Sequence, residues 1–137
     1  MTDSFEFVIR DFEVKPKARA RVFWREGKIQ KFTPTASLEK HLAWTIIAEK
    51  MKIPDFEMIC SICGIDIVIF SRTTLKGDCD NYQKLIFDAI EKAKVVQNDR
   101  LFRDCRIRIF DKSYRKEKNV LDDETNNDII FIKIWTL

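Results

Sequence analysis

The stretch IDIVIFSRTTLKGDCDNYQKLIFDAIEKA, residues 65–93, holds the clearest strand signal and the clearest helix signal of the sequence. Its first residues end a β-rich run, residues 56–70, whose apolar side chains fall on both faces, as in a central strand. Residues 71–77 form a loop, and Asp80 then begins a helix whose apolar residues recur with a period of about 3.6. These apolar positions are Tyr82, Leu85, Ile86, Ala89, Ile90 and Ala93.

The segments before this stretch add strands and another helix. In Phe5–Arg10, aromatic and β-branched residues alternate with polar ones, which predicts a strand. Gly27 supplies the turn of a predicted β-hairpin. Capping residues in Thr33–Ser37 lead into a helix that extends to about Lys52 and ends before Pro54. Its buried stripe is predicted to consist of Leu38, Leu42, Ala43, Ile46, Ile47 and Met51.

The segments after it supply two further strands. Cys105–Asp111 alternates apolar with largely basic residues, and Ile129–Trp135 closes the chain as a strand. Lys112–Asn127 between them is a long charged loop. The order of these elements predicts an α+β fold: a single domain, residues 1–137, with a mixed β-sheet and two main helices.

The composition restricts the class of protein. Hydrophobic residues make up 45% of the 137 residues, enough for a core, and the charged 34% is mixed in sign. No apolar run reaches the roughly 18 residues of a membrane helix, and the first residues lack the pattern of a signal peptide. We therefore expect a cytoplasmic protein with no membrane partner, in which the four cysteines are reduced.

The net charge of +3 is unevenly distributed along the chain. Residues 15–31 carry a net charge of +6, residues 100–118 carry +5, and the remainder sums to −8. Two separated basic segments favour a polyanion such as nucleic acid as the partner. Either segment taken alone is equally compatible with the solvated face of a strand.

The cysteines and the single histidine form no recognisable catalytic motif. Cys60 and Cys63 have the spacing of half a zinc site, but the other half is missing, and positions three apart on a strand point to opposite faces. We therefore expect no zinc and interpret the cysteines as small buried hydrophobic residues. His41 has no acidic or nucleophilic motif beside it, and the three glycines are too scattered for a phosphate-binding loop.

The carboxylates around the second helix give the strongest chemical signal. Asp78 and Asp80 stand where the loop enters the helix, and Asp99 lies in the turn after it. Lys84 and Asp88 follow Asp80 at steps of four, which advance only about 40° around a helix and so share one polar stripe. Converging carboxylates near a lysine suit a hard cation such as Mg²⁺, which activates water and offsets the charge that grows on a phosphate.

A purely structural interpretation of the same residues is also possible. Asp80 is a good helix N-cap, and Gln83 completes a pair that resembles a capping box. Asp80, Lys84 and Asp88 would then be ordinary ion pairs on a solvated face. The flanking basic segments favour the functional interpretation, because a site for both a metal and a phosphodiester needs charges of both signs.

The motif DxDNxxKxxxDA at residues 78–89, followed by DR at residues 99–100, resembles the signature of the RusA family of Holliday-junction resolvases. The segments VKPKAR at residues 14–19 and FTP at residues 32–34 are similar to the N-terminal part of the same family. The resemblance extends from about Phe5 to Ile109. It implies a small metal-dependent endonuclease that acts as a homodimer on four-way DNA junctions.

The resemblance also implies roles for individual residues. Asp78, Asp80 and Asp99 would hold Mg²⁺, with Mn²⁺ as a substitute, and Lys84 would contact the scissile phosphate or the leaving oxygen. Asp88 matches a recurrent acidic position of the family.

Two asparagines, Asn81 and Asn98, lie next to these residues in the sequence. Asn81 belongs to the motif itself and would stand in a second layer around the metal. The family usually has two adjacent aspartates where this chain has Asn98 and Asp99. Asn98 offers a carbonyl oxygen without charge, which disfavours a second metal site.

The basic segments supply the expected contacts to DNA phosphates, which carry little base information. The expected DNA-binding residues are Lys15, Lys17, Arg19, Arg21, Lys76, Arg100, Arg106 and Arg108. The leading hypothesis is a Mg²⁺-dependent endonuclease that resolves junctions by paired symmetric nicks in recombination and repair. The alternatives are a catalytically degenerate junction-binding protein and an interaction module with a solvated acidic helix.

Overall fold

The computed structural model describes residues 4–12, 21–32, 36–114 and 128–137, and in this part of the chain the main strands and helices occur in the predicted order. The strands are β1 (Ser4–Phe12), β2 (Arg21–Arg25), β3 (Lys28–Phe32), β4 (Cys63–Phe70), β5 (Phe102–Phe110) and β6 (Asp128–Thr136). The helices are α1 (Ala36–Met51), α2 (Cys79–Lys92) and the short 3-10 helix η1 (Asp99–Leu101). The predicted α+β class is confirmed.

A four-stranded mixed sheet in the order β1-β6-β4-β5 forms the centre of the molecule. Strand β6 is antiparallel to both of its neighbours, whereas β4 and β5 are parallel. The predicted position of β4 inside the sheet is confirmed, but its predicted start at Phe56 is wrong. The chain before Cys63 leaves the sheet because Ile59 pairs instead with the turn after α2, where its N–H donates to the Val95 carbonyl at 2.9 Å.

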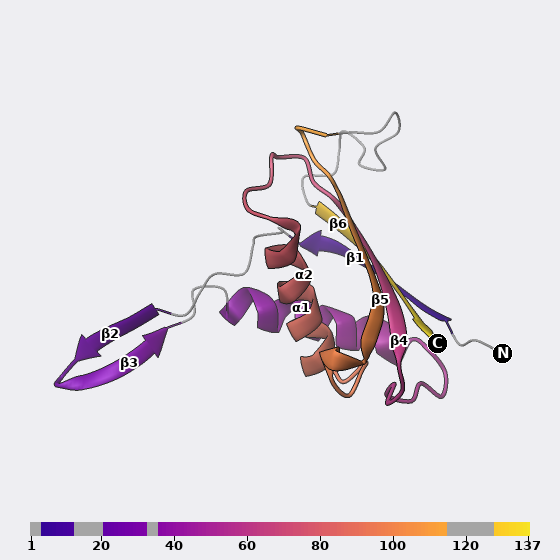
Figure 1. Cartoon of the computed structure of the whole chain (residues 1–137), viewed down its shortest axis with the longest axis horizontal. Helices are drawn as coiled ribbons and strands as arrows, with labels where there is room; N and C mark the ends of the chain where they lie inside the picture. Colours follow the sequence, from indigo (N-terminus) through magenta and orange to yellow (C-terminus); the bar gives the residue numbers. More distant parts are fainter. Residues whose placement is uncertain (1–3, 13–20, 33–35, 115–127) are drawn as a thin grey trace.

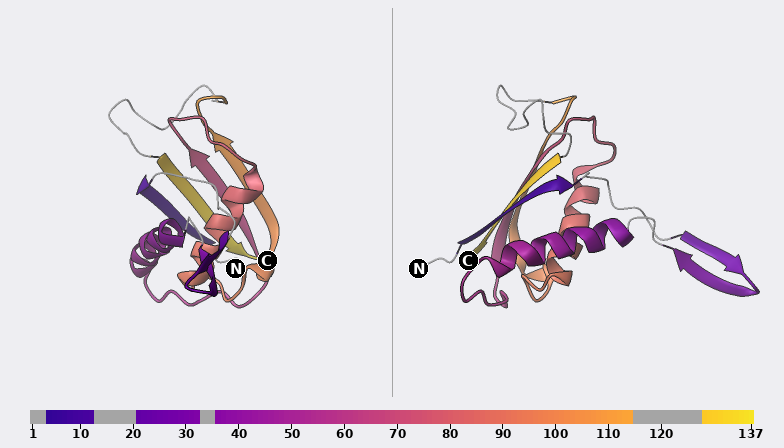
Figure 2. Two further views of the ribbon diagram at one scale, coloured as in Figure 1. Left: turned by 90° about the vertical axis from the view of Figure 1, so that its left-hand side faces the viewer. Right: turned by 180° about the vertical axis from the view of Figure 1, so that it is seen from behind.

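Helices α1 and α2 cover one face of this sheet (Figures 1 and 2). The side chains of Ile65, Ile67 and Ile69 on β4 point into this layer and are fully buried. All six apolar positions predicted for the second helix are buried, which confirms the stripe of α2. Because α2 lies with this stripe on the sheet, its opposite, polar face is turned to solvent.

The predicted stripe of α1 is only partly correct. Leu42, Ala43 and Ile46 are buried, and Leu38 and Ile47 pack partly against the core. Met51, however, is 79% exposed, and so the prediction for this residue is wrong. Apolar residues occur on every side of α1, so periodicity could not decide which face the fold would bury.

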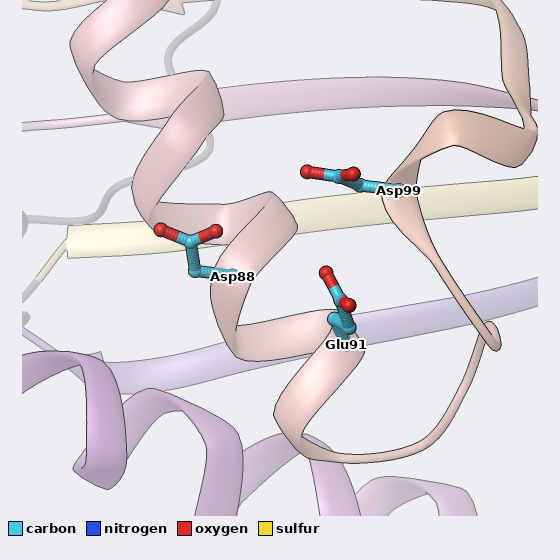
Figure 3. Close-up of side chains that lie close together, drawn as sticks. All are labelled: Asp88, Glu91 and Asp99. Atoms are coloured by element: carbon cyan, nitrogen blue, oxygen red, sulfur yellow. The ribbon is translucent and has the colours of Figure 1, made fainter.

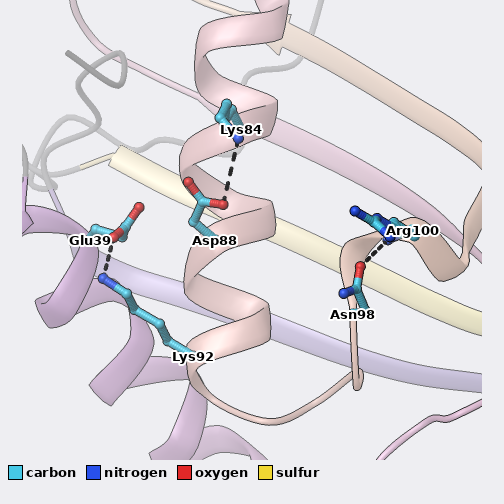
Figure 4. Close-up of polar contacts among 6 residues, drawn as sticks. All are labelled: Glu39, Lys84, Asp88, Lys92, Asn98 and Arg100. Atoms are coloured by element: carbon cyan, nitrogen blue, oxygen red, sulfur yellow. Dashed lines mark hydrogen bonds and ion pairs between the residues drawn. The ribbon is translucent and has the colours of Figure 1, made fainter. Parts of the chain in front are cut away.

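Polar contacts fasten the C-terminal half of α2 to α1 (Figure 4). Lys92 of α2 forms an ion pair with Glu39 of α1, which is buried. Lys50 of α1 donates to the carbonyl of Ala93, the C-cap residue of α2, at 2.8 Å. These contacts fix the C-terminal part of α2, which carries Asp88 and Glu91.

The predicted hairpin is confirmed as a separate two-stranded sheet of β2 and β3 (Figure 1). Glu26 and Gly27 form its turn with φ values of 54° and 74°, the conformation that a tight hairpin requires. None of the described helices is long and apolar enough to cross a membrane.

The sheet face away from the helices contains a close approach between Gly64 and Trp135. These residues are neighbours on β4 and β6, and a Cβ atom at Gly64 would lie 2.4 Å from the Trp135 ring. We expect Gly64→Ala to lower the free energy of unfolding by about 1–3 kcal/mol, because the ring must shift. Urea unfolding measures this loss. The same substitution in a Trp135→Ala background should cost much less, and an equal loss in both backgrounds would contradict the explanation.

Candidate active site

Asp78 and Asp80 stand at the N-terminal end of α2. Asp78 is the N-cap, with an extended backbone, and its carbonyl accepts the Asn81 N–H at 3.0 Å, but its side chain makes no cap hydrogen bond. The interpretation of Asp80 as the N-cap is therefore wrong, because the helix begins earlier and Asp80 lies in its first turn. Both carboxylates, and Asn81 beside them, are exposed. The fold leaves these carboxylates available to a ligand, next to a helix end that favours negative charge.

Lys84 and Asp88 continue the polar face of α2. The Lys84 ammonium lies 3.9 Å from Asp88 Oδ1, as drawn in Figure 4. The side chain of Lys84 is 64% exposed and that of Asp88 is 19% exposed. An ion pair this open to solvent contributes little to stability. The contact places the Lys84 ammonium beside Asp88 on the polar face of the helix.

An acidic cluster forms where η1 meets this face of α2. One carboxylate oxygen from each of Asp88, Glu91 and Asp99 lies within 4.8 Å of the other two. Figure 3 shows Asp99 pointing from η1 toward the two residues on the helix. Oxygen donors at this spacing fit a hard divalent cation such as Mg²⁺ or Mn²⁺, since such ions prefer carboxylate ligands.

The cluster differs from the ligand set that the sequence predicts. Asp99 belongs to both, but in the part of the chain described here Asp78 and Asp80 do not join it in a group within 4.8 Å. They lie toward the other end of α2, which rises about 1.5 Å per residue. Glu91 was missed by the sequence analysis. The sequence did contain a signal for Glu91: it follows Asp88 by three residues and so lies on the same polar stripe of the helix.

Asn98 has a structural role in η1. Its side-chain oxygen accepts the Arg100 N–H at 2.8 Å and caps the 3-10 helix (Figure 4). An uncharged asparagine suffices for this bond. The residue that departs from the usual family pattern thus orients the turn that carries Asp99.

The predicted DNA-binding residues fall into three groups. Lys76 and Arg100 are exposed, one just before α2 and the other in η1. Arg106 and Arg108 are exposed on β5, on the sheet face away from the helices, where they pair with Asp104 at 3.9 Å and Asp66 at 2.9 Å. Arg21 begins β2, and Lys15, Lys17 and Arg19 lie outside the described residues.

The cysteines do not share one environment. Cys63 is buried, and burial, with a smaller effect of Cys105, raises the pKa of its thiol to about 11. Cys60, Cys79 and Cys105 are exposed, so the interpretation of all four as buried hydrophobic residues is wrong. Cys60 precedes β4, Cys79 is in the first turn of α2, and Cys105 is on the edge strand β5. Within the described residues, no cysteine takes part in a cluster suited to a metal.

A comparison with known protein families shows to which family the chain belongs. The model of the endodeoxyribonuclease RusA family matches residues 11–121, which is most of the chain. The chain belongs to the RusA family. The family's matched span includes α2, η1 and the whole carboxylate set from Asp78 to Asp99. No curated protein matches the chain.

Proposed function

We propose that this RusA-family protein is a Mg²⁺-dependent, structure-selective endodeoxyribonuclease that resolves four-way DNA junctions by paired symmetric nicks in recombination and repair. The observation that carries the proposal is the family match over residues 11–121, which includes every carboxylate of the motif on α2 and η1. We further propose that the protein acts in the cytoplasm and that the whole chain forms one nuclease domain.

In this proposal Asp78, Asp80 and Asp99 hold the metal ion. A bound Mg²⁺ would supply a Lewis acid that offsets the charge growing on the phosphate. The carboxylates themselves bind and orient the ion; the two at the start of α2 are exposed, and the Asp78 side chain makes no cap hydrogen bond. Asp99 is supported in this role because it already lies among acidic oxygens spaced for a divalent cation.

Lys84 would contact the scissile phosphate or the leaving oxygen. Its ammonium is exposed on the same face of α2 as the carboxylates, and Asp88 lies 3.9 Å from it. A cation in this position stabilises negative charge that develops during cutting. Asp88 orients Lys84, and Asn81 and Asn98 support the carboxylates next to them.

The proposed DNA contacts rest on four exposed basic residues of the described chain and on the basic segment near Arg21. Lys76 and Arg100 lie in the segments that flank α2 in the chain and would bind phosphates close to the cut. Arg106, Arg108 and the basic segment near Arg21 would bind more distant phosphates. Symmetric nicks in two strands need two active sites, and a two-fold homodimer provides them.

A cleavage assay on a synthetic four-way junction tests the proposal. At low salt and with Mg²⁺ or Mn²⁺, we expect nicks in two opposed strands of the junction and little cutting of the same sequences as linear duplex. Binding should weaken steeply as salt rises, since it rests on phosphate contacts. A protein that binds junctions but never cuts them with either metal would refute the enzymatic part.

A catalytically degenerate junction-binding protein is the second candidate. It is favoured by Asn98, which replaces an acid usual in the family and whose side-chain oxygen is engaged by Arg100. This candidate predicts junction binding with or without divalent metal and no nicks. The Asp78→Asn variant described in the Discussion separates the two candidates.

A further inference from the structure

Asp111, the residue that follows β5, is a buried carboxylate outside the proposed metal-binding set, and only 6% of it is exposed. Its Oδ1 accepts the N–H groups of Ser113 and Tyr114 at 2.9 and 3.1 Å and the Ser113 hydroxyl at 2.6 Å. Its Oδ2 accepts the Leu75 N–H at 2.9 Å. Both oxygens of this carboxylate therefore have partners, as burial requires.

The bond to Leu75 fastens the loop that joins β4 to α2. The loop and the end of β5 lie at the same end of the sheet (Figure 1), because β4 and β5 are parallel. Backbone bonds attach the start of the loop to the end of β5 and the residue after Asp111. They are Ser71 N–H to the Phe110 carbonyl at 2.9 Å and Lys112 N–H to the Thr73 carbonyl at 3.3 Å. Asp111 extends this attachment to Leu75, three residues before Asp78.

The far side of the loop is fastened to the helix. The hydroxyl of Tyr82, a residue of α2 that is 1% exposed, donates to the Lys76 carbonyl. Between these attachments and the helix, Gly77 takes a φ of 90°, which glycine adopts without strain. Since Asp78 makes no side-chain cap bond, the position of its carboxylate depends on the bond from the Asn81 N–H to its carbonyl and on these contacts of the loop.

We propose that Asp111 is a positioning residue that sets the location of the Asp78 carboxylate, where the loop enters α2, through its bond to the loop. Its consequence for cutting rests on the proposed function. Asp78 lies at most about 11 Å of extended chain beyond Leu75, so a loop released at Leu75 can displace the Asp78 carboxylate. Misplacement by about 1 Å is enough to lower a catalytic rate on the order of 100-fold.

The ionised form of Asp111 suits this role. Burial alone would raise the pKa of its carboxyl, but hydrogen bonds from Ser113, Leu75 and Tyr114 outweigh that effect and hold the pKa below its ordinary value. The carboxylate is thus charged at neutral pH, and its hydrogen bonds are of the stronger, charge-assisted kind.

The first test compares Asp111→Ala and Asp111→Asn with a matched control, Asp55→Asn, which changes an exposed aspartate in the turn after α1. In single-turnover cutting well below the thermal midpoint, we expect Asp111→Ala to be slower on the order of 100-fold. It should also need more Mg²⁺, with junction affinity measured without metal unchanged. Asp111→Asn keeps an acceptor oxygen and should lose less. A wild-type rate and Mg²⁺ dependence in Asp111→Ala would overturn the proposal.

The second test does not depend on cutting. Amide hydrogen exchange should accelerate in residues 71–80 of Asp111→Ala, while α1 and β6 keep the protection of the wild type. Unchanged protection of residues 71–80, or acceleration that is equal in every element, would overturn the proposal. If the wild-type protein cuts no junction, the proposed function fails, whereas this exchange pattern still decides whether Asp111 holds the loop.

Discussion

Asp78→Asn is expected to lower the rate of junction cutting by about 10²–10⁴-fold while junction binding is retained or improved. The substitution removes a charge from the proposed metal site, and the loss of one carboxylate also reduces repulsion of the phosphates. The side chain of Asp78 is exposed and makes no cap hydrogen bond, so the free energy of unfolding should stay within about 0.5 kcal/mol of the wild type.

The measurement is single-turnover cutting of a labelled junction with Mg²⁺, beside a binding titration without metal. Asp55→Asn is the matched control, because it removes an exposed aspartate elsewhere on the surface. Cutting by Asp78→Asn at the wild-type rate would exclude Asp78 as a ligand. Equal absence of cutting in the wild type and in the variant, with intact binding, would instead support the degenerate junction-binding protein.

Asp99→Asn is expected to abolish both cutting and the thermal stabilisation that Mg²⁺ or Mn²⁺ produces. Asp99 is the carboxylate shared by the predicted ligand set and the cluster seen in the structure. A metal that binds only the folded state raises its stability, so the midpoint of thermal unfolding should rise with metal in the wild type and stay constant in the variant. If the unfolding midpoint of the variant still rose with metal, Asp99 would be excluded as a ligand.

Two companion variants locate the ion along α2. Since the proposed ligands are Asp78, Asp80 and Asp99, Asp80→Asn should lose cutting, and Glu91→Gln should retain most of it at saturating Mg²⁺. Loss of cutting in Glu91→Gln with retention in Asp80→Asn would move the metal to the cluster of Asp88, Glu91 and Asp99. The unfolding midpoint of each variant without metal serves as the control for folding.

Much of the fold could be predicted because its signals are local. The period of α2, the alternation in β1 and β5 and the glycine turn of the hairpin each depend on residues close together in the chain. The start of β4 could not be predicted in this way. The residues before Cys63 are as apolar as those after it, and only the pairing of Ile59 with the turn after α2 takes them out of the sheet.

The candidate site shows the same division. Asp80, Lys84 and Asp88 could be assigned to one polar face of α2 from spacing alone. The packing of η1 against α2 decides which residues accompany Asp99, and it adds Glu91 to that group. The function of Asn98 as the cap of η1 also appears only in the structure, because an asparagine before an aspartate is compatible with several kinds of turn.

The sequence by itself determined the order of the elements, the buried face of α2 and the carboxylates at its start, since side-chain periodicity and helix-initiating residues act within a few positions. Only the tertiary structure decided that Met51 and most of the cysteines are exposed, and that Asp111 reaches the loop before Asp78. Leu75 and Asp111 are 36 residues apart. A hydrogen bond across that separation exists because parallel strands end side by side, and it leaves no periodic trace in the sequence.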